Sequence, residues 1–292
     1  MNRLVLFLMC VGVLIANSHA FFAPYDDKKP ATQKAHEEAL RGFDRAKFDA
    51  YKATLPKDGS YYVVEGDLLL TEAELQDYAV GKANPDTQEK RVVPNSELLV
   101  NLLQDGKKDY YEDVSQRTLT YAVDRQSFPN KSRYDQLVKN VRRAAGEWQS
   151  ACQTCQIKMV HVTEHDASPS TEKVNFIVRY HDSGGDYIAA AFFPHYAPLR
   201  RNLNIDPSYY TTSFDKVGVL RHELGHVLGY RHEHIQGVPG CYVEDDRWEP
   251  LTRYDPNSVM HYFCGGGGSM KLKITKSDKL GHQKLYGPGG GQ

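Results

Sequence analysis

Three histidines and one glutamate occur together in the run His-Glu-Leu-Gly-His-Val-Leu-Gly-Tyr-Arg-His. On a helix, His222 and His226 lie one turn apart, so both imidazoles project from one face and can bind the same Zn²⁺. Gly229 can adopt the left-handed conformation that ends the helix, which lets His232 turn back as a third ligand. Glu223 is then placed to take a proton from a zinc-bound water, whose pKa the metal lowers to about 7. The pattern therefore predicts one catalytic Zn²⁺ and hydrolysis by an activated water.

This run fits the H-E-x-x-H-x-x-G-x-x-H pattern of the metzincin clan of zinc proteases, and further residues resemble the astacin family in particular. Ser-Val-Met-His-Tyr at 258 to 262 resembles the Met-turn of that clan, in which the methionine, here Met260, packs beneath the metal. The resemblance implies that Tyr262 is a switchable extra ligand that helps to stabilise the tetrahedral intermediate. Glu233 directly follows the third histidine, as in astacins, in which this carboxylate contacts the mature amino terminus. A solvated surface acid is the alternative for Glu233.

Val-Glu-Gly-Asp at 64 to 67 resembles the aspartate switch of astacin propeptides, in which a carboxylate occupies the open position of the metal. The resemblance implies that Asp67 is a metal ligand in the latent form only. An ordinary turn with a positive φ at its glycine is the alternative. No cysteine lies between Ala20 and Gln116, so latency through a cysteine ligand is excluded.

The resemblance covers about residues 60 to 287, most clearly around the histidine run and the Met-turn. It departs from astacins in the stretch between His232 and Met260, which is short, and in having few cysteines for the disulfides usual in that family. These departures concern the placement of Tyr262 and the loops of the substrate pocket rather than the zinc ligands.

The first 20 residues have the pattern of a secretory signal peptide. Arg3 precedes an apolar run from Leu4 to Ile15, and Ser-His-Ala at 18 to 20 provides small residues before a cleavage site. The run is too short to span a membrane, and no other stretch approaches about 18 continuous apolar residues. We therefore expect a secreted, extracellular protein without membrane attachment.

The charge balance gives no sign of a polyanionic partner. The chain has 36 basic and 37 acidic side chains and a formal net charge of −1, so no long-range field favours nucleic acid or anionic lipid. The expected partners are a protein or peptide substrate and an activating protease, and the expected state is a monomer.

Four cysteines follow the signal peptide: Cys152, Cys155, Cys241 and Cys264. An even number in an oxidising compartment predicts disulfides, with three possible connectivities. We favour Cys241–Cys264, which would join the loop after the third histidine to the segment past the Met-turn, and which leaves Cys152–Cys155 as a local closure. A thioredoxin-like C-x-x-C is the alternative, but it lacks a βαβ setting.

The predicted fold class is α+β: a metzincin-type catalytic domain with a mixed twisted sheet, an N-terminal packing helix and a zinc-binding helix, preceded by a pro-segment. The expected divisions are a signal peptide at 1–20, a propeptide at 21–115, a catalytic domain at 116–288 and a disordered tail at 289–292. Strands are expected at 118–124, 157–162, 174–180, 187–193, 202–205 and 272–274. Helices are expected at 132–148, with a capping box at Ser132 and Asp135, at 214–228 and at 278–285.

These features predict a secreted zinc endopeptidase made as a zymogen. Glu223 would deprotonate the water and pass the proton to the leaving amine, while Tyr262 donates to the oxyanion. The alternatives are a matrixin-like metzincin, in which Tyr262 is not near the metal, and a secreted zinc-containing binding module without proteolytic activity, which would not need Glu223. A cell-wall peptide as the substrate is a third possibility.

Substrate contacts and a second metal site are predicted less directly. An extended substrate would pair with an edge strand around residues 189 to 193. Lys271 and Lys273 are candidates for favouring acidic substrate residues, with solvated lysines as the alternative. For His181 the default is a satisfied or solvated histidine, and a second zinc or calcium site together with Asp182 is the alternative.

Overall fold

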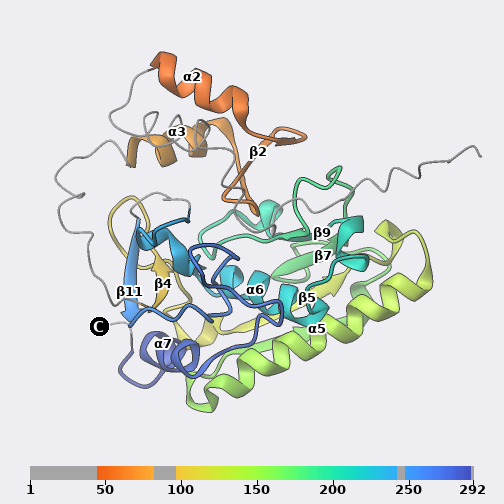
Figure 1. Ribbon diagram of the computed structural model, residues 1–292. Coiled ribbons are helices and arrows are strands. Elements are labelled where there is room, and N and C mark those ends of the chain that lie inside the picture. Colours follow the sequence, from red (N-terminus) through yellow and green to blue (C-terminus); the bar gives the residue numbers. More distant parts are fainter. Residues whose placement is uncertain (1–44, 82–96, 242–246, 291–292) are drawn as a thin grey trace, which may run out of the picture.

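The computed structural model describes residues 45–81, 97–241 and 247–290. The expected signal peptide lies outside these ranges. Within them the chain forms α-helices and three β-sheets, as expected for an α+β protein. In Figure 1 a smaller part, which contains α2, β2 and α3, lies against a larger body that contains the histidine run.

A five-stranded mixed sheet forms the centre of the larger body, in the order β6-β5-β7-β9-β8. Four of the strands are parallel, and β8 is an antiparallel edge strand. The strands are β5 (Thr118–Val123), β6 (Lys158–His161), β7 (Phe176–Tyr180), β8 (Ala189–Ala190) and β9 (Asn202–Ile205). The strand predicted at 187–193 is therefore shortened to two residues. Ala191 instead forms a parallel bridge with Leu68 of the smaller part.

Two helices support the histidine run. Helix α5 (Lys131–Ala151) runs beside the sheet in Figure 1 and buries one apolar face, as its 3.6-residue periodicity predicts. The indole Nε1 of Trp148 on this face donates to the carbonyl oxygen of Arg221 at 2.8 Å. Arg221 belongs to helix α6 (Lys216–Val227), which carries the first two histidines. Helix α5 thus fixes the position of the helix that carries the chemistry.

The predicted capping box at Ser132 is wrong. Asn130 is the N-cap of α5, and its side chain accepts from the backbone N–H of Arg133 at 3.0 Å. Because the helix begins at Lys131, Ser132 is already its second residue. An asparagine is as good an N-cap as a serine.

A second sheet has the order β10-β4-β11, formed by β4 (Glu97–Asn101), β10 (Tyr230–Arg231) and β11 (Trp248–Thr252). The central strand β4 lies in the range expected as propeptide, yet its residues 98 to 100 are fully buried, and Leu98 and Val100 belong to the main core. Beside this sheet lies helix α7 (Lys276–Tyr286), which opens with a capping box between Thr275 and Asp278. The strand expected at 272–274 does not form, because Leu272 has a φ of 41°, which is incompatible with an extended strand.

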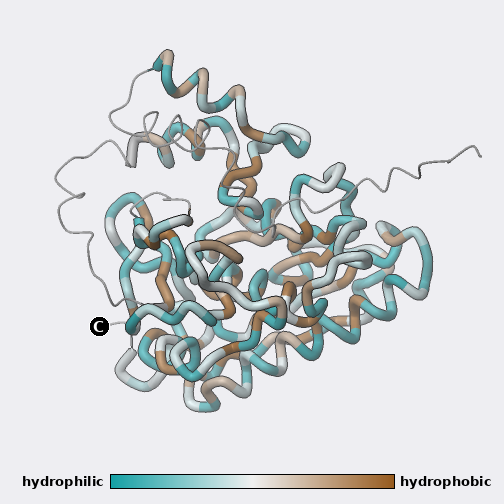
Figure 2. The backbone as a smooth tube through the Cα atoms, viewed as in Figure 1, coloured by the Kyte–Doolittle hydropathy of each residue, from teal (hydrophilic) through white to brown (hydrophobic). Residues whose placement is uncertain are grey.

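The smaller part comprises α2 (Arg45–Thr54), β1 (Lys57–Asp58), β2 (Tyr61–Val64), β3 (Leu68–Leu70) and α3 (Glu72–Gly81). Its three strands form an antiparallel sheet in chain order. It has its own apolar cluster, made of Phe48, Tyr51, Tyr62, Val64, Leu70, Leu75, Tyr78 and Ala79. Figure 2 shows apolar residues along the β2–β3 hairpin. The turn of this hairpin carries Asp67. We call this part, residues 45–81, the clamp.

Both predicted disulfides, Cys152–Cys155 and Cys241–Cys264, are present. No helix in the described ranges combines the length and the apolar character needed to cross a membrane. Of the expected tail, Gly289 and Gly290 form a turn in which the N–H of Gly290 donates to Gly287.

Candidate metal centre

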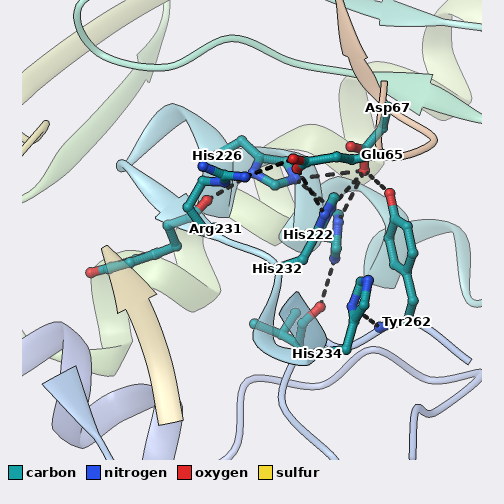
Figure 3. A network of polar contacts seen from close by, with 10 residues as sticks. Glu65, Asp67, His222, His226, Arg231, His232, His234 and Tyr262 are labelled. Atoms are coloured by element: carbon teal, nitrogen blue, oxygen red, sulfur yellow. Dashed lines mark hydrogen bonds and ion pairs between the residues drawn. The ribbon is translucent and has the colours of Figure 1, made fainter. Parts of the chain in front are cut away.

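The structure brings the three histidines of the run together at one point. His222 and His226 come from α6, and His232 follows β10 after the chain reverses at Gly229, which has a φ of 92°. All three side chains are fully buried, and the carboxylate of Asp67 reaches them from the clamp (Figure 3). Together they form a buried group of four potential metal ligands.

The outer nitrogens of two imidazoles are held by backbone carbonyls. His222 Nδ1 lies 2.8 Å from the carbonyl oxygen of Val259, and His226 Nδ1 lies 2.8 Å from that of Tyr230. A carbonyl oxygen can only accept, so each Nδ1 carries a proton, and each Nε2 presents a lone pair to the common centre. Burial lowers the pKa of His222 and lowers that of His226 to about 4, which keeps both imidazoles neutral. Neutral imidazoles are what a metal ion requires.

The spacing of the inner atoms suits Zn²⁺. His226 Nε2 and His232 Nε2 lie 3.2 Å apart, and Asp67 Oδ2 lies 3.2, 3.5 and 3.2 Å from the Nε2 atoms of His222, His226 and His232. Ligands of a tetrahedral zinc with bonds of about 2.0–2.1 Å would lie about 3.3–3.4 Å apart. These residues therefore fit the metal, with three imidazoles and one carboxylate at the four corners.

Asp67 is tied to the site by more than the histidines. The hydroxyl of Tyr262 donates to Asp67 Oδ2 at 2.5 Å, and its ring lies beside those of His222 and His232. Burial alone would raise the pKa of Asp67, but attraction chiefly to the imidazole of His232 outweighs it and holds the pKa well below its usual range. An ionised carboxylate thus occupies the corner that a water would need.

Glu223 stands apart from this network. Its side chain is fully buried, and among the described residues neither carboxylate oxygen has a hydrogen-bond partner. Burial, reinforced by the negative charge of Asp67, raises the pKa of Glu223 well above its ordinary value. An unsatisfied buried carboxylate is costly for stability. Its position beside the metal ligands is that of a group that can take up and return a proton.

Met260 packs beneath the helix that carries the histidines. A Cβ added at Gly225 would lie 2.3 Å from Met260 Sδ, so the sulfur is in direct contact with α6. The turn is held by Asp278, whose carboxylate accepts from Ser258 Oγ at 2.6 Å and from the backbone N–H of Val259 at 3.0 Å. Sequence reasoning missed this role of Asp278, because it lies 19 residues after Val259.

Glu233 is fully buried, so the alternative of a solvated surface acid is wrong. Its backbone N–H donates to the carbonyl oxygen of Met260 at 2.9 Å, and its Oε1 accepts from Gln236 Nε2 at 3.2 Å. Glu233 thus joins the third histidine to the Met-turn. Its contact with a mature amino terminus stays a prediction.

A buried ion pair beside the metal ligands was also missed. Glu65 of the clamp accepts from Arg231 Nη2 at 2.7 Å, and both side chains are at most 3% exposed. Glu65 Oε2 also lies 3.6 Å from His232 Nδ1. A cavity of about 260 Å³ adjoins Arg231 and separates the clamp from residues such as Phe193. The available signal was Arg231 itself, a charged residue inside the histidine run.

The remaining candidates lie elsewhere. His181 Nε2 lies 2.7 Å from Asp58 Oδ1 of the clamp, and Asp182 accepts from the backbone N–H of Gly184. Neither belongs to a group of three potential metal ligands in the described part of the chain. Lys271 and Lys273 are exposed.

Comparisons with known proteins add little to this geometry. No known family profile matches the chain. Over 67 residues, which are 16% of this chain and 6% of the relative, the sequence is 31% identical to Dorsal-ventral patterning protein tolloid of Drosophila melanogaster. The solved structure of myroilysin is similar with a TM-score of 0.43 and 15% identity, over 63% of this chain and 97% of the other. The GM1-bound form of the ECX AB5 holotoxin gives 0.36 and 13%, over 64% and 78%. Because these TM-scores are below 0.5, the functional argument rests on the site.

Proposed function

We propose that this chain is a secreted zinc endopeptidase of astacin-like type, made as a zymogen in which the clamp blocks the metal centre. The observation that carries the proposal is the carboxylate of Asp67 at the fourth corner of a three-histidine site, next to a buried and unpartnered Glu223. The signal-like first 20 residues and the two disulfides support secretion.

The residues of the chain divide the chemistry among them. His222, His226 and His232 would hold Zn²⁺, which when bound acidifies a water and polarises the scissile carbonyl. Glu223 would take a proton from the attacking water and would return it to the amine as the C–N bond breaks. Tyr262, released from Asp67, donates its O–H to the oxygen that becomes negative.

Two features favour this proposal over its alternatives. In a matrixin-like site Tyr262 would lie away from the metal, whereas here its hydroxyl donates to the carboxylate at the centre. A binding module would gain nothing from burying an unpartnered Glu223. We expect the physiological substrate to be a protein or peptide and the active form to be a monomer.

The test measures zinc content and hydrolysis of a heat-unfolded protein by the exported chain, before and after limited digestion with trypsin. We expect one zinc per chain, activity only after digestion, and none in the digested Glu223→Gln variant, which keeps its zinc. Glu172→Gln, at an exposed acid, is the matched control and should stay active. Activity that survives Glu223→Gln would refute the mechanism. If zinc is bound but no digested form hydrolyses the substrate, the binding module is favoured. The tested forms must include one whose intact mass matches that of the natural secreted protein.

A further inference from the structure

The ring of Tyr262 stacks on a buried imidazole outside the group of four potential metal ligands. This imidazole is that of His234, in the 3₁₀ helix η7 (Glu233–Gln236), which directly follows the third histidine. The two ring centres are 4.8 Å apart, with 25° between the planes, and Figure 3 shows the side chains next to each other. This separation and angle are those of a favourable stacked aromatic pair.

The peptide groups on both sides of Tyr262 are also bound by imidazoles. The backbone N–H of Tyr262 donates to His234 Nδ1 at 3.4 Å, which is long for a hydrogen bond and therefore weak. The carbonyl oxygen of Tyr262 accepts from His261 Nδ1 at 2.5 Å. With its proton on Nδ1, His261 can accept at Nε2 from the hydroxyl of Tyr254, which lies 2.7 Å away. The backbone of Tyr262 is thus held from two directions.

The hydroxyl end of Tyr262 is held partly by the clamp in the latent form. The hydroxyl donates to Asp67, and a Cβ added at Gly66 would lie 3.3 Å from the hydroxyl oxygen. These two contacts are lost when the clamp leaves, whereas His234 and His261 belong to the catalytic body. A tyrosine side chain can rotate about its single bonds, and the stack with His234 opposes that rotation.

We propose that His234 is a positioning residue, which holds the Tyr262 ring so that its hydroxyl stays directed at the metal centre after the clamp has left. This inference rests on the proposed peptidase function. A donor that is fixed where negative charge develops stabilises the transition state without first having to reorient. Loss of His234 should therefore lower kcat and change KM little, because the hydroxyl acts mainly on the transition state.

The experiment is a double-mutant cycle in the trypsin-activated enzyme, measured as kcat and KM on a quenched peptide. Tyr262→Phe should lower kcat by about 100- to 1,000-fold, as loss of one oxyanion donor does. His234→Ala should lower kcat by about 10- to 100-fold, the effect of misplacing a catalytic group by about 1 Å. Added to Tyr262→Phe, His234→Ala should cost less than about twofold more, because the hydroxyl that it positions is gone. His234→Phe keeps a flat ring for the stack and should retain most of kcat.

A second measurement needs no turnover. Because the hydroxyl of Tyr262 lies at the metal centre, Tyr262→Phe should change the visible spectrum of the activated, cobalt-substituted enzyme. His234→Ala should shift the spectrum in the same direction. His165→Ala, at a half-buried histidine of another segment, is the matched control and should leave kcat and the spectrum unchanged. Zinc content and urea unfolding of each variant separate a misplaced tyrosine from a lost metal or a lost fold.

The inference is overturned if His234→Ala lowers kcat equally with and without Tyr262→Phe, because the role of His234 would then be structural. It is also overturned if either single variant leaves kcat unchanged. If His234→Ala does not fold, His234→Leu, with a side chain of more similar size, takes its place in the cycle. If no form shows cleavage that depends on Glu223, the proposed function fails, and the cobalt spectra alone decide whether His234 positions Tyr262.

Discussion

Replacing Asp67 with alanine in the uncut exported chain should release part of the latent activity. Asp67 Oδ2 lies within 3.5 Å of three imidazole nitrogens and accepts from the hydroxyl of Tyr262, and the side chain is almost fully buried. Breaking a buried pair of this kind costs about 3–5 kcal/mol. That cost corresponds to a shift of about 100- to 5,000-fold toward the open site.

The release should stop short of full activity, because other contacts keep the clamp on the catalytic body. Asp58 accepts from Tyr187 and pairs with His181, and Arg200 pairs with Glu74. The assay is the initial rate on a quenched peptide, with intact mass to show that the chain is uncut. The double variant with Glu223→Gln shows that the rate belongs to this site.

Asp58→Ala is the matched control, since it removes another aspartate of the clamp that contacts the catalytic body but not the metal ligands. It should raise the rate far less than Asp67→Ala. The reasoning is refuted if the uncut Asp67→Ala chain is as inactive as the wild type while the trypsin-treated chain is active. It is also refuted if both alanine variants raise the rate equally.

Three further predictions concern the frame around the site. Gly229→Ala should destabilise the chain by about 2–4 kcal/mol in urea unfolding, because a Cβ there would lie 2.0 Å from a carbonyl oxygen at a φ of 92°. Gly59→Ala, with a φ of 60° and open space, should cost only about 1 kcal/mol, the penalty of the left-handed conformation itself. Equal costs at the two positions would contradict the expected clash at Gly229. Asp278→Ala should weaken zinc binding by about 10- to 100-fold in a chelator competition. The carboxylate of Asp278 holds Val259, whose carbonyl oxygen orients the imidazole of His222. An unchanged zinc affinity would show that Asp278 does not support the metal ligand. A form that begins at residue 97 should unfold cooperatively on heating. A form that begins at residue 116 lacks the buried central strand β4, and the loss of its three apolar side chains should lower the free energy of unfolding by about 4–9 kcal/mol. A stable form from residue 116 would place β4 in the pro-segment.

Local patterns predicted much of the molecule. The three histidines of the candidate site lie within 11 residues, so helical spacing and one glycine suffice to bring them together. Strands within 118–124 and at 202–205 were also found, because both segments contain alternating apolar and polar residues, as strands with one more deeply buried face do. The cysteine pairing could be predicted because Cys152 and Cys155 are close in the sequence, and because Cys241 and Cys264 follow the third histidine and the Met-turn, which the metal site was expected to bring together.

Features that depend on distant partners were not predictable. Glu65 and Arg231 are 166 residues apart, and a single acid in a turn gives no sign of the cation that it meets. The strand at 97–101 was assigned to the propeptide because the surrounding stretch is polar, but its pairing with β10 and β11 depends on segments more than 120 residues away. The strand expected at 272–274 is absent because Leu272 has a φ of 41°, and apolar periodicity does not report the backbone conformation.

The apolar cluster of the clamp has a consequence for how long inhibition lasts. A covalently tethered inhibitor acts at an effective local concentration in the millimolar range, whereas a severed one acts only at its bulk concentration. Cutting the link between the clamp and the catalytic body leaves the clamp's own core and its contacts with the cleft unchanged. Under the proposed function, the first product of activation is therefore a competitive inhibitor in trans, and secreted enzyme becomes fully active only as dilution or digestion removes its own clamp.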